Sequence, residues 1–216
     1  MFGVRYPDWL DRLKQQRAIA VVRSPTLAMG YGMARAVVEA GMEFVEVGWN
    51  GDRPAELVRR LRDEFPHCQI GAGTLVNARQ VREAIAARSQ FLFCPHTDVE
   101  AVRIAIEAGV PMVPGALSPT EILTAWTAGA AAVKVFPVQA VGGASYIRSL
   151  KSPLDFVPFV PTGGVTLDNA RSLVDAGAIA VGISSSLFPR SLVESEDWQG
   201  IAGLASRLRS NLGANG

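Results

Sequence analysis

Cysteine and histidine are scarce in this 216-residue chain, because each occurs only twice. Cys68 and Cys94 lack CxxC spacing, so neither a disulfide framework nor a zinc site is indicated, and free thiols in a reducing cytosol are expected. The two histidines have no HExxH or carboxylate-rich context. We therefore expect no metal and no other cofactor.

An excess of charge of either sign is also missing, since the formal net charge is +1. The arginines, such as Arg59, Arg60 and Arg62, fall on predicted helical faces and form no stripe interleaved with aromatic residues, which argues against nucleic acid and a membrane surface as partners. No uncharged apolar run reaches membrane-spanning length. Charged residues between positions 5 and 14 occupy the place of a signal peptide's apolar stretch, so we expect no export.

What the chain does contain is a repeated alternation of short apolar runs with segments of helical periodicity. Several predicted helices end in Ala-Gly, at Gly41, Gly109, Gly129 and Gly177, where glycine can adopt the left-handed conformation of a helix C-cap. The eight predicted strands are residues 18–22, 44–47, 70–73, 91–93, 112–113, 132–135, 157–160 and 179–183.

Eight such units in a chain of about 200–250 residues predict an α/β fold, a (β/α)8 (TIM) barrel. Residues 7–13 predict an extra N-terminal helix that closes one end of the barrel. We expect a single domain over residues 1–216. A doubly wound open sheet shares the local pattern, but no GxGxxG motif follows the first predicted strand.

Two charged residues interrupt the apolar runs: Glu46 within 44–47 and Lys134 within 132–137. If both runs are strands, each charged side chain points away from its flanking valines. In a closed barrel the two strands would face each other, so Glu46 and Lys134 would converge. A lysine desolvated by apolar neighbours has a lowered pKa and can form a Schiff base. A buried structural salt bridge is the alternative.

Small and hydroxyl-bearing residues follow three other predicted strands. Thr74 comes after Gly71 and Gly73, and it is either a hydrogen-bond donor at the barrel mouth or a helix N-cap. Residues 161–165 and 182–186 follow the last two strands and are rich in glycine and serine. Loops at these positions of barrels often hold a phosphate, which predicts a small phosphorylated substrate.

The chain resembles the 2-keto-3-deoxy-6-phosphogluconate (KDPG) and 4-hydroxy-2-oxoglutarate aldolase family over roughly residues 15–190. The resemblance implies a homotrimeric barrel that cleaves KDPG to pyruvate and glyceraldehyde 3-phosphate through a Schiff base, without metal. The free thiols and the charged N-terminal segment predict a cytoplasmic location. The motifs that carry it are residues 44–47, 71–75, 113–115, 133–137 and 161–164.

By position, the resemblance implies that Lys134 is the Schiff-base lysine and Glu46 the general acid/base. It implies that Thr74 contacts the pyruvyl carboxylate. The remaining substrate-binding residues that it implies, several of them at the hydroxyl and phosphate end, are Asn50, Pro95, Phe136, Thr162, Gly163, Gly164, Ser184 and Ser185.

Asn50 departs from the pattern of the better-known members, which carry a carboxylate-binding arginine at this position. Members that act on the galactonate epimer resemble the asparagine version, whereas Thr162 before the glycine pair resembles the gluconate type. Arg53 either reaches the substrate carboxylate from the same loop or is a surface charge before the helix-starting Pro54.

Other functions remain open from the sequence. The substrate could be the galactonate epimer or 4-hydroxy-2-oxoglutarate. A phosphate-binding isomerase would use the same two loops with an acid and a base but no pyruvate-reactive amine. A noncatalytic sugar-phosphate sensor would bind without turnover.

Overall fold

Parallel strands alternate with helices along the chain in the computed structural model, which describes residues 6–213. Residues 1–5 and 214–216, which include the start of the charged N-terminal segment and both ends of the predicted domain, lie outside the described residues. The strands are β1 (Ala18–Val22), β2 (Phe44–Gly48), β3 (Gln69–Gly73), β4 (Leu92–Phe93), β5 (Met112–Val113), β6 (Gly115–Ala116), β7 (Val133–Val135), β8 (Phe159–Pro161) and β9 (Val181–Ile183).

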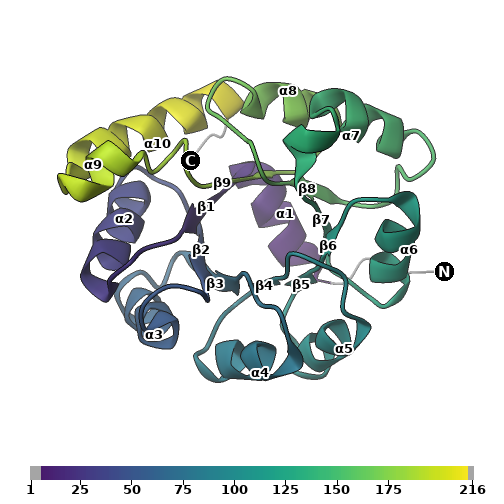
Figure 1. Ribbon diagram of the computed structural model, residues 1–216, viewed down its shortest axis with the longest axis horizontal. Helices are drawn as coiled ribbons and strands as arrows, with labels where there is room; N and C mark the ends of the chain where they lie inside the picture. Colours follow the sequence, from purple (N-terminus) through teal and green to yellow (C-terminus); the bar gives the residue numbers. More distant parts are fainter. Residues whose placement is uncertain (1–5, 214–216) are drawn as a thin grey trace.

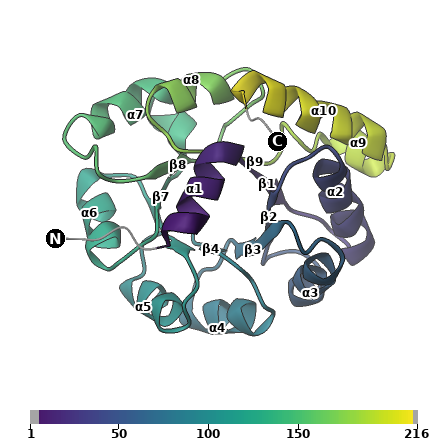
Figure 2. The same cartoon turned by 180° about the vertical axis from the view of Figure 1, so that it is seen from behind.

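Helices α2 to α10 lie outside the strands, as Figures 1 and 2 show. They are α2 (Leu27–Glu39), α3 (Pro54–Glu64), α4 (Ala78–Ala86), α5 (Val99–Glu107), α6 (Pro119–Thr127), α7 (Ala144–Lys151), α8 (Ala170–Asp175), α9 (Arg190–Glu194) and α10 (Trp198–Leu212). The described chain also contains helix α1 (Pro7–Gln16) and a short 3₁₀ helix over Val138–Val141. Among the described helices, none has the length and apolar composition needed to cross a membrane.

The predicted closed (β/α)8 barrel is wrong. The strand ladders form two separate parallel sheets: a curled six-stranded sheet in the order β5-β4-β3-β2-β1-β9, and a three-stranded sheet in the order β6-β7-β8. Between β8 and β9, the described residues form an isolated bridge of Thr162 with Gly182 and a hydrogen bond from the Ile179 N–H to the Phe159 carbonyl. The fold is a half-barrel with a smaller sheet beside it.

The two sheets are also separated between β5 and β6, where the strands are short and a proline intervenes. The predicted fifth strand, 112–113, is present as β5, but the additional strand β6 follows it after one residue, Pro114. Proline has no N–H to donate to a ladder, so the regular pairing loses a hydrogen bond there. Backbone hydrogen bonds from the Ala131 N–H to the Met112 carbonyl and from the Lys134 N–H to the Pro114 carbonyl, both 2.9 Å, still cross this point. Strand β7, which carries Lys134, pairs with β6 instead.

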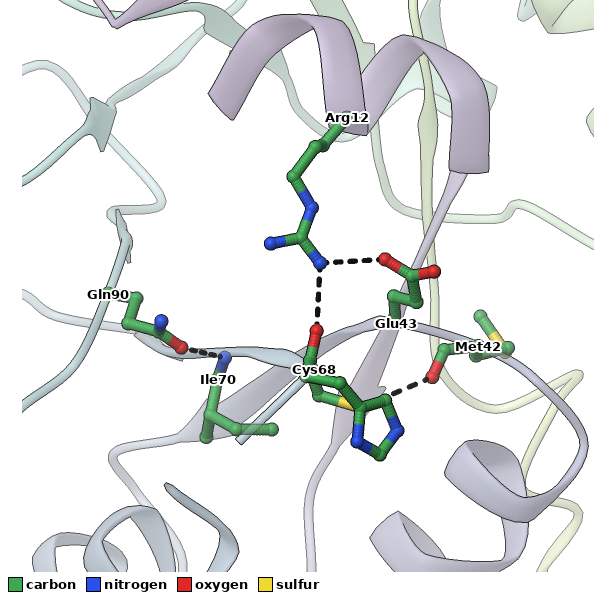
Figure 3. Close-up of polar contacts among 7 residues, drawn as sticks. Arg12, Met42, Glu43, Cys68, Ile70 and Gln90 are labelled. Carbon is green, nitrogen blue, oxygen red and sulfur yellow. Dashed lines mark hydrogen bonds and ion pairs between the residues drawn. The ribbon is translucent and has the colours of Figure 1, made fainter. Parts of the chain in front are cut away.

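Helix α1 lies across one end of the strands, as predicted, and is seen in front in Figure 2. Its side chains Trp9, Leu10 and Leu13 pack into a buried cluster with inward-facing strand residues such as Phe44. Figure 3 shows how Arg12 fastens the helix, since its guanidinium donates to Glu43 at 2.7 Å and to the His67 carbonyl at 2.8 Å. That end of the interior is therefore closed.

The two-residue period of the strands sorts side chains between two cores. Ile19 and Phe44 belong to the inner cluster closed by α1, whereas Ala20 and Val45 belong to the larger cluster beneath the outer helices. Positions that continue the inward series toward the carboxyl ends of the strands reach the other, unplugged end of the interior. The site lies there.

Candidate active site

Glu46 and Lys134 continue the inward series of their strands. Glu46 lies two residues beyond Phe44, and Lys134 two residues beyond Ala132, and both reference residues belong to the inner cluster. Both charged side chains are buried, with exposed fractions of 1% for Glu46 and 2% for Lys134. The structure brings them into one interior from different sheets.

Burial shifts both pKa values toward the uncharged forms. Desolvation lowers the pKa of Lys134 below its usual value of 10.5, and the attraction of Glu46 offsets this only in part. Desolvation likewise raises the pKa of Glu46 against the opposing charges of Lys134 and Arg23. Burial therefore favours the neutral amine and the neutral carboxylic acid, which are the forms of a nucleophile and a proton donor.

No direct ion pair ties the two groups together. Among the ion pairs between described residues, none includes Glu46 or Lys134. The Glu46 Oε1 atom is buried and has no hydrogen-bond partner. A buried polar atom without a partner costs free energy, so a structural salt bridge is a poor explanation of this pair.

Thr74 lies at the carboxyl end of β3, directly after Gly73. Its φ of 59° is in the left-handed region, which is uncommon for a β-branched residue. Its Oγ1 atom is buried and has no partner. A strained backbone beside an unpartnered hydroxyl is typical of a ligand-binding position.

The glycine and serine loops after β8 and β9 form a small cavity of about 70 Å³. Gly163 and Gly164 have φ values of 88° and 79°, which permit the backbone to approach a ligand closely. The Ser184 hydroxyl donates to the Val21 carbonyl at 2.9 Å, so it is already engaged. Of the predicted residues, those lining the cavity are Phe136, Thr162, Gly163, Gly164, Ser184 and Ser185.

Arg23 lines the same cavity and was missed by the sequence reasoning. It follows β1 and continues the inward series from Ile19 and Val21, which is a signal that the sequence offered. Its charge acts on both Glu46 and Lys134. Arg23 therefore supplies a cation between the buried pair and the glycine loops.

The remaining predicted residues lie at the rim. Asn50 is exposed on the loop after β2, and Pro95 is half-buried, two residues after the end of β4. Arg53 is exposed and pairs with Asp52 at 3.6 Å and Glu56 at 3.3 Å, so it is engaged as a surface charge. No cluster of three or more possible metal ligands occurs within residues 6–213.

Comparison with known proteins finds one family over nearly the whole chain. The family model described as "KDPG and KHG aldolase" matches residues 10–204. A protein of Treponema pallidum named "2-dehydro-3-deoxy-phosphogluconate aldolase" is 30% identical over 203 residues, which cover 94% of this chain and 97% of that protein.

Two solved structures have the same fold at 30% identity. One is described as "Native KDPGal structure", with a TM-score of 0.82 over 90% of this chain and 93% of the other. The second is "a cube-shaped, highly porous protein cage designed by fusing symmetric oligomeric domains", with a TM-score of 0.83 over 90% of this chain and 71% of the other.

Proposed function

The chain belongs to the KDPG and KHG aldolase family, and from this we propose that it is a Schiff-base aldolase that cleaves KDPG to pyruvate and glyceraldehyde 3-phosphate. The observation that carries the proposal is the buried Lys134 amine, 2% exposed, in one interior with the buried Glu46 carboxyl. A neutral lysine is the nucleophile that a ketone substrate requires.

Lys134 forms the covalent intermediate. Its neutral Nζ attacks the C2 carbonyl carbon to give a carbinolamine, and loss of the C2 oxygen as water gives a protonated imine. When the C3–C4 bond breaks, its electron pair moves into this iminium and forms an enamine. The lowered pKa of Lys134 increases the fraction of the amine that is in the neutral, attacking form.

Glu46 moves the protons. In its neutral form, favoured by the raised pKa, it donates the proton with which the carbinolamine oxygen leaves as water. The resulting carboxylate accepts the C4 hydroxyl proton as the aldehyde forms. It then returns that proton to C3 of the enamine, and hydrolysis of the imine releases pyruvate and free Lys134.

The substrate's two anionic ends use different residues. The phosphate is held at the cavity of Gly163, Gly164 and Ser185, with Arg23 supplying positive charge. Thr74 and Asn50 donate hydrogen bonds to the pyruvyl carboxylate. Pro95 and Phe136 border the substrate between these ends, and Thr162 faces its hydroxyl groups.

Borohydride trapping tests the proposal. With pyruvate present, sodium borohydride should inactivate the enzyme and leave a reduced pyruvyl group on Lys134. The chain has only three lysines, so peptide mass mapping separates this site from Lys14 and Lys151. Lys151→Arg is the matched control and should trap normally.

An adduct on another lysine, or no adduct, contradicts the Schiff-base assignment. Absence of an adduct together with interconversion of sugar phosphates would identify an isomerase. Binding without any turnover would identify a sensor. Cleavage of 4-hydroxy-2-oxoglutarate or of the galactonate epimer in preference to KDPG would retain the mechanism and change the substrate.

We also propose that the protein is a homotrimer. A structure of similar fold at 30% identity comes from a cage built of symmetric oligomeric domains, which supports self-association. Between α5 and α6 lies a groove of about 550 Å³ whose lining includes Val99 and Leu123. These apolar side chains are 52% and 41% exposed in the single chain, as expected for an interface between copies. The cytosolic location stays a prediction.

A further inference from the structure

Gly73, the last residue of β3, lies directly beneath the carboxyl group of Glu46. A Cβ atom on Gly73 would lie 1.7 Å from Glu46 Oε1, 2.3 Å from its Cδ and 2.7 Å from its Cγ. These distances are far below van der Waals contact. The Glu46 carboxyl therefore occupies the volume that any side chain at position 73 would take.

The backbone itself does not require a glycine here. The φ of Gly73 is outside the left-handed region, unlike those of Gly163 and Gly164. An alanine could adopt the strand conformation at this position without strain. The three atoms nearest to that Cβ all belong to Glu46.

Neighbouring hydrogen bonds hold the Gly73 backbone in place. Gly73 pairs with Gly48 in the parallel ladder of β2 and β3, and its carbonyl accepts from the Trp49 N–H at 2.8 Å. With the backbone held by β2, the flexible end of Glu46 must yield to a side chain at position 73.

The space that Gly73 leaves for the Glu46 carboxyl is buried away from solvent. Glu46 Oε1 and Thr74 Oγ1 are both buried there without a partner. Other charged or titratable groups that interact with Glu46 come from three further elements: Lys134 on β7, Arg23 after β1 and Cys94 after β4. None of these forms an ion pair or hydrogen bond with the Glu46 carboxyl among the described contacts.

We propose that Gly73 is a positioning residue for the reaction: by lacking a side chain, it holds the Glu46 carboxyl over the end of β3, apart from Lys134. The inference rests on the proposed acid/base role of Glu46. Gly73 touches no reacting atom, and its effect is transmitted entirely through the place that Glu46 occupies.

The test is Gly73→Ala, with Gly203→Ala as the matched control. Gly203 lies on α10, and nothing is within 4 Å of the Cβ that alanine would add there. Gly73→Ala should fold, because its clash is with the end of a flexible side chain. We expect kcat to fall by about 10²-fold, the scale of a misplaced catalytic group, with little change in KM. Gly203→Ala should behave as wild type.

The pH profile separates positioning from a structural role. Displaced from the dry site, toward solvent or toward Lys134, the Glu46 carboxyl ionises more easily. The inflection of the kcat profile that reports ionisation of Glu46 should therefore move to lower pH in Gly73→Ala. A reduced kcat with an unmoved profile overturns the proposal.

A double-mutant cycle supplies the second readout. In a Glu46→Ala background the obstructed carboxyl is gone, so Gly73→Ala should cause no further loss of kcat. An equal loss in both backgrounds means that Gly73 acts independently of Glu46 and overturns the proposal. Normal turnover by Glu46→Ala alone refutes the acid/base role first and the positioning role with it. Impaired Glu46→Ala beside fully active Gly73→Ala refutes only the positioning role.

Discussion

The Nζ atom of Lys134 lies 4.9 Å from the centroid of the Phe136 ring. The ring of Phe93 is 5.9 Å from the same atom, so aromatic carbon occupies space around the amine that water would otherwise fill. A nearby ring attracts a cation, but that attraction is worth only about 0.5–2 kcal/mol and the net effect of burial is still a lowered pKa.

The first prediction is that Lys134→Met stabilises the folded protein at pH 7. The pKa of Lys134 is lower in the folded chain than its ordinary 10.5, so between these values the unfolded chain binds more protons at this residue. The wild-type free energy of unfolding therefore rises with pH across that window. The advantage of the variant, about 1.4 kcal/mol for each unit by which the pKa is lowered, should shrink as pH approaches 10.5.

Urea denaturation at pH 7 and pH 10 measures this difference. Lys14→Met is the control, because Lys14 is exposed and its ion pair with Asp11 lies on the surface. A Lys134→Met variant that unfolds more easily than wild type at pH 7 would show that the lysine stabilises the fold.

The second prediction is that Glu46→Gln folds normally and turns over roughly 10²–10⁴-fold more slowly, the usual contribution of a general acid/base. The amide has nearly the carboxyl's shape but cannot donate and recover the proton. Glu43→Gln is a matched control, since Glu43 precedes the same strand and pairs with Arg12 at the closed end. Near-normal turnover by Glu46→Gln, measured by pyruvate release, would leave Glu46 without a catalytic role.

The third prediction is that Asn50→Arg lowers the KM for pyruvate in the condensation direction. Asn50 is exposed at the rim, so an arginine can be accommodated there. Its charged fork binds a carboxylate more strongly than an amide does, by about 1 kcal/mol or roughly fivefold. Asn50→Gln retains the amide and should leave KM near the wild-type value. An unchanged or higher KM in Asn50→Arg means that the carboxylate is bound elsewhere.

The buried pair was predictable from the sequence because strand periodicity is local. A charged residue between valines, in a run with strand character, has its direction set by the two-residue alternation. That alternation places Glu46 with Phe44 and Lys134 with Ala132, whatever the neighbouring strands are. Strands β1 and β5 also span the predicted residues 18–22 and 112–113.

Closure of the sheet was not predictable in the same way. It depends on hydrogen bonds between strands distant in sequence, and several of these strands have only two or three residues. Pro114 between β5 and β6 is a local sign of the interruption. Arg23 was missed because its role also depends on distant segments. It follows the apolar run of β1, and it lines a cavity formed with the loops after β8 and β9.

The fourth prediction concerns the groove between α5 and α6. If copies of the chain associate there, Leu123→Glu places a charge in the interface and should shift the sedimentation coefficient from trimer toward monomer. Gly203→Glu is the control, because α10 lies away from α5 and α6 in Figure 1. A trimer that survives Leu123→Glu, with unchanged concentration dependence, would place the interface on another face.

The last prediction is that Thr162 favours the gluconate epimer. Its Oγ1 atom is buried without a partner, next to the substrate cavity. A Cβ on Gly182 would lie 2.5 Å from that atom, so a larger residue at position 182 would displace the Thr162 hydroxyl. An unpartnered hydroxyl gains most from a ligand that completes its hydrogen bond, and the two epimers differ in the direction of a hydroxyl group.

Wild-type enzyme should therefore cleave the gluconate epimer with the higher kcat/KM and the galactonate epimer measurably more slowly. Thr162→Val keeps the shape and removes the hydroxyl, so the ratio of the two kcat/KM values should fall by about fivefold, the effect of one hydrogen bond of about 1 kcal/mol. Thr162→Ser, which keeps the hydroxyl, should retain the preference. If wild-type enzyme instead prefers the galactonate epimer, the threonine argument is wrong, and Asn50 is the better guide to specificity.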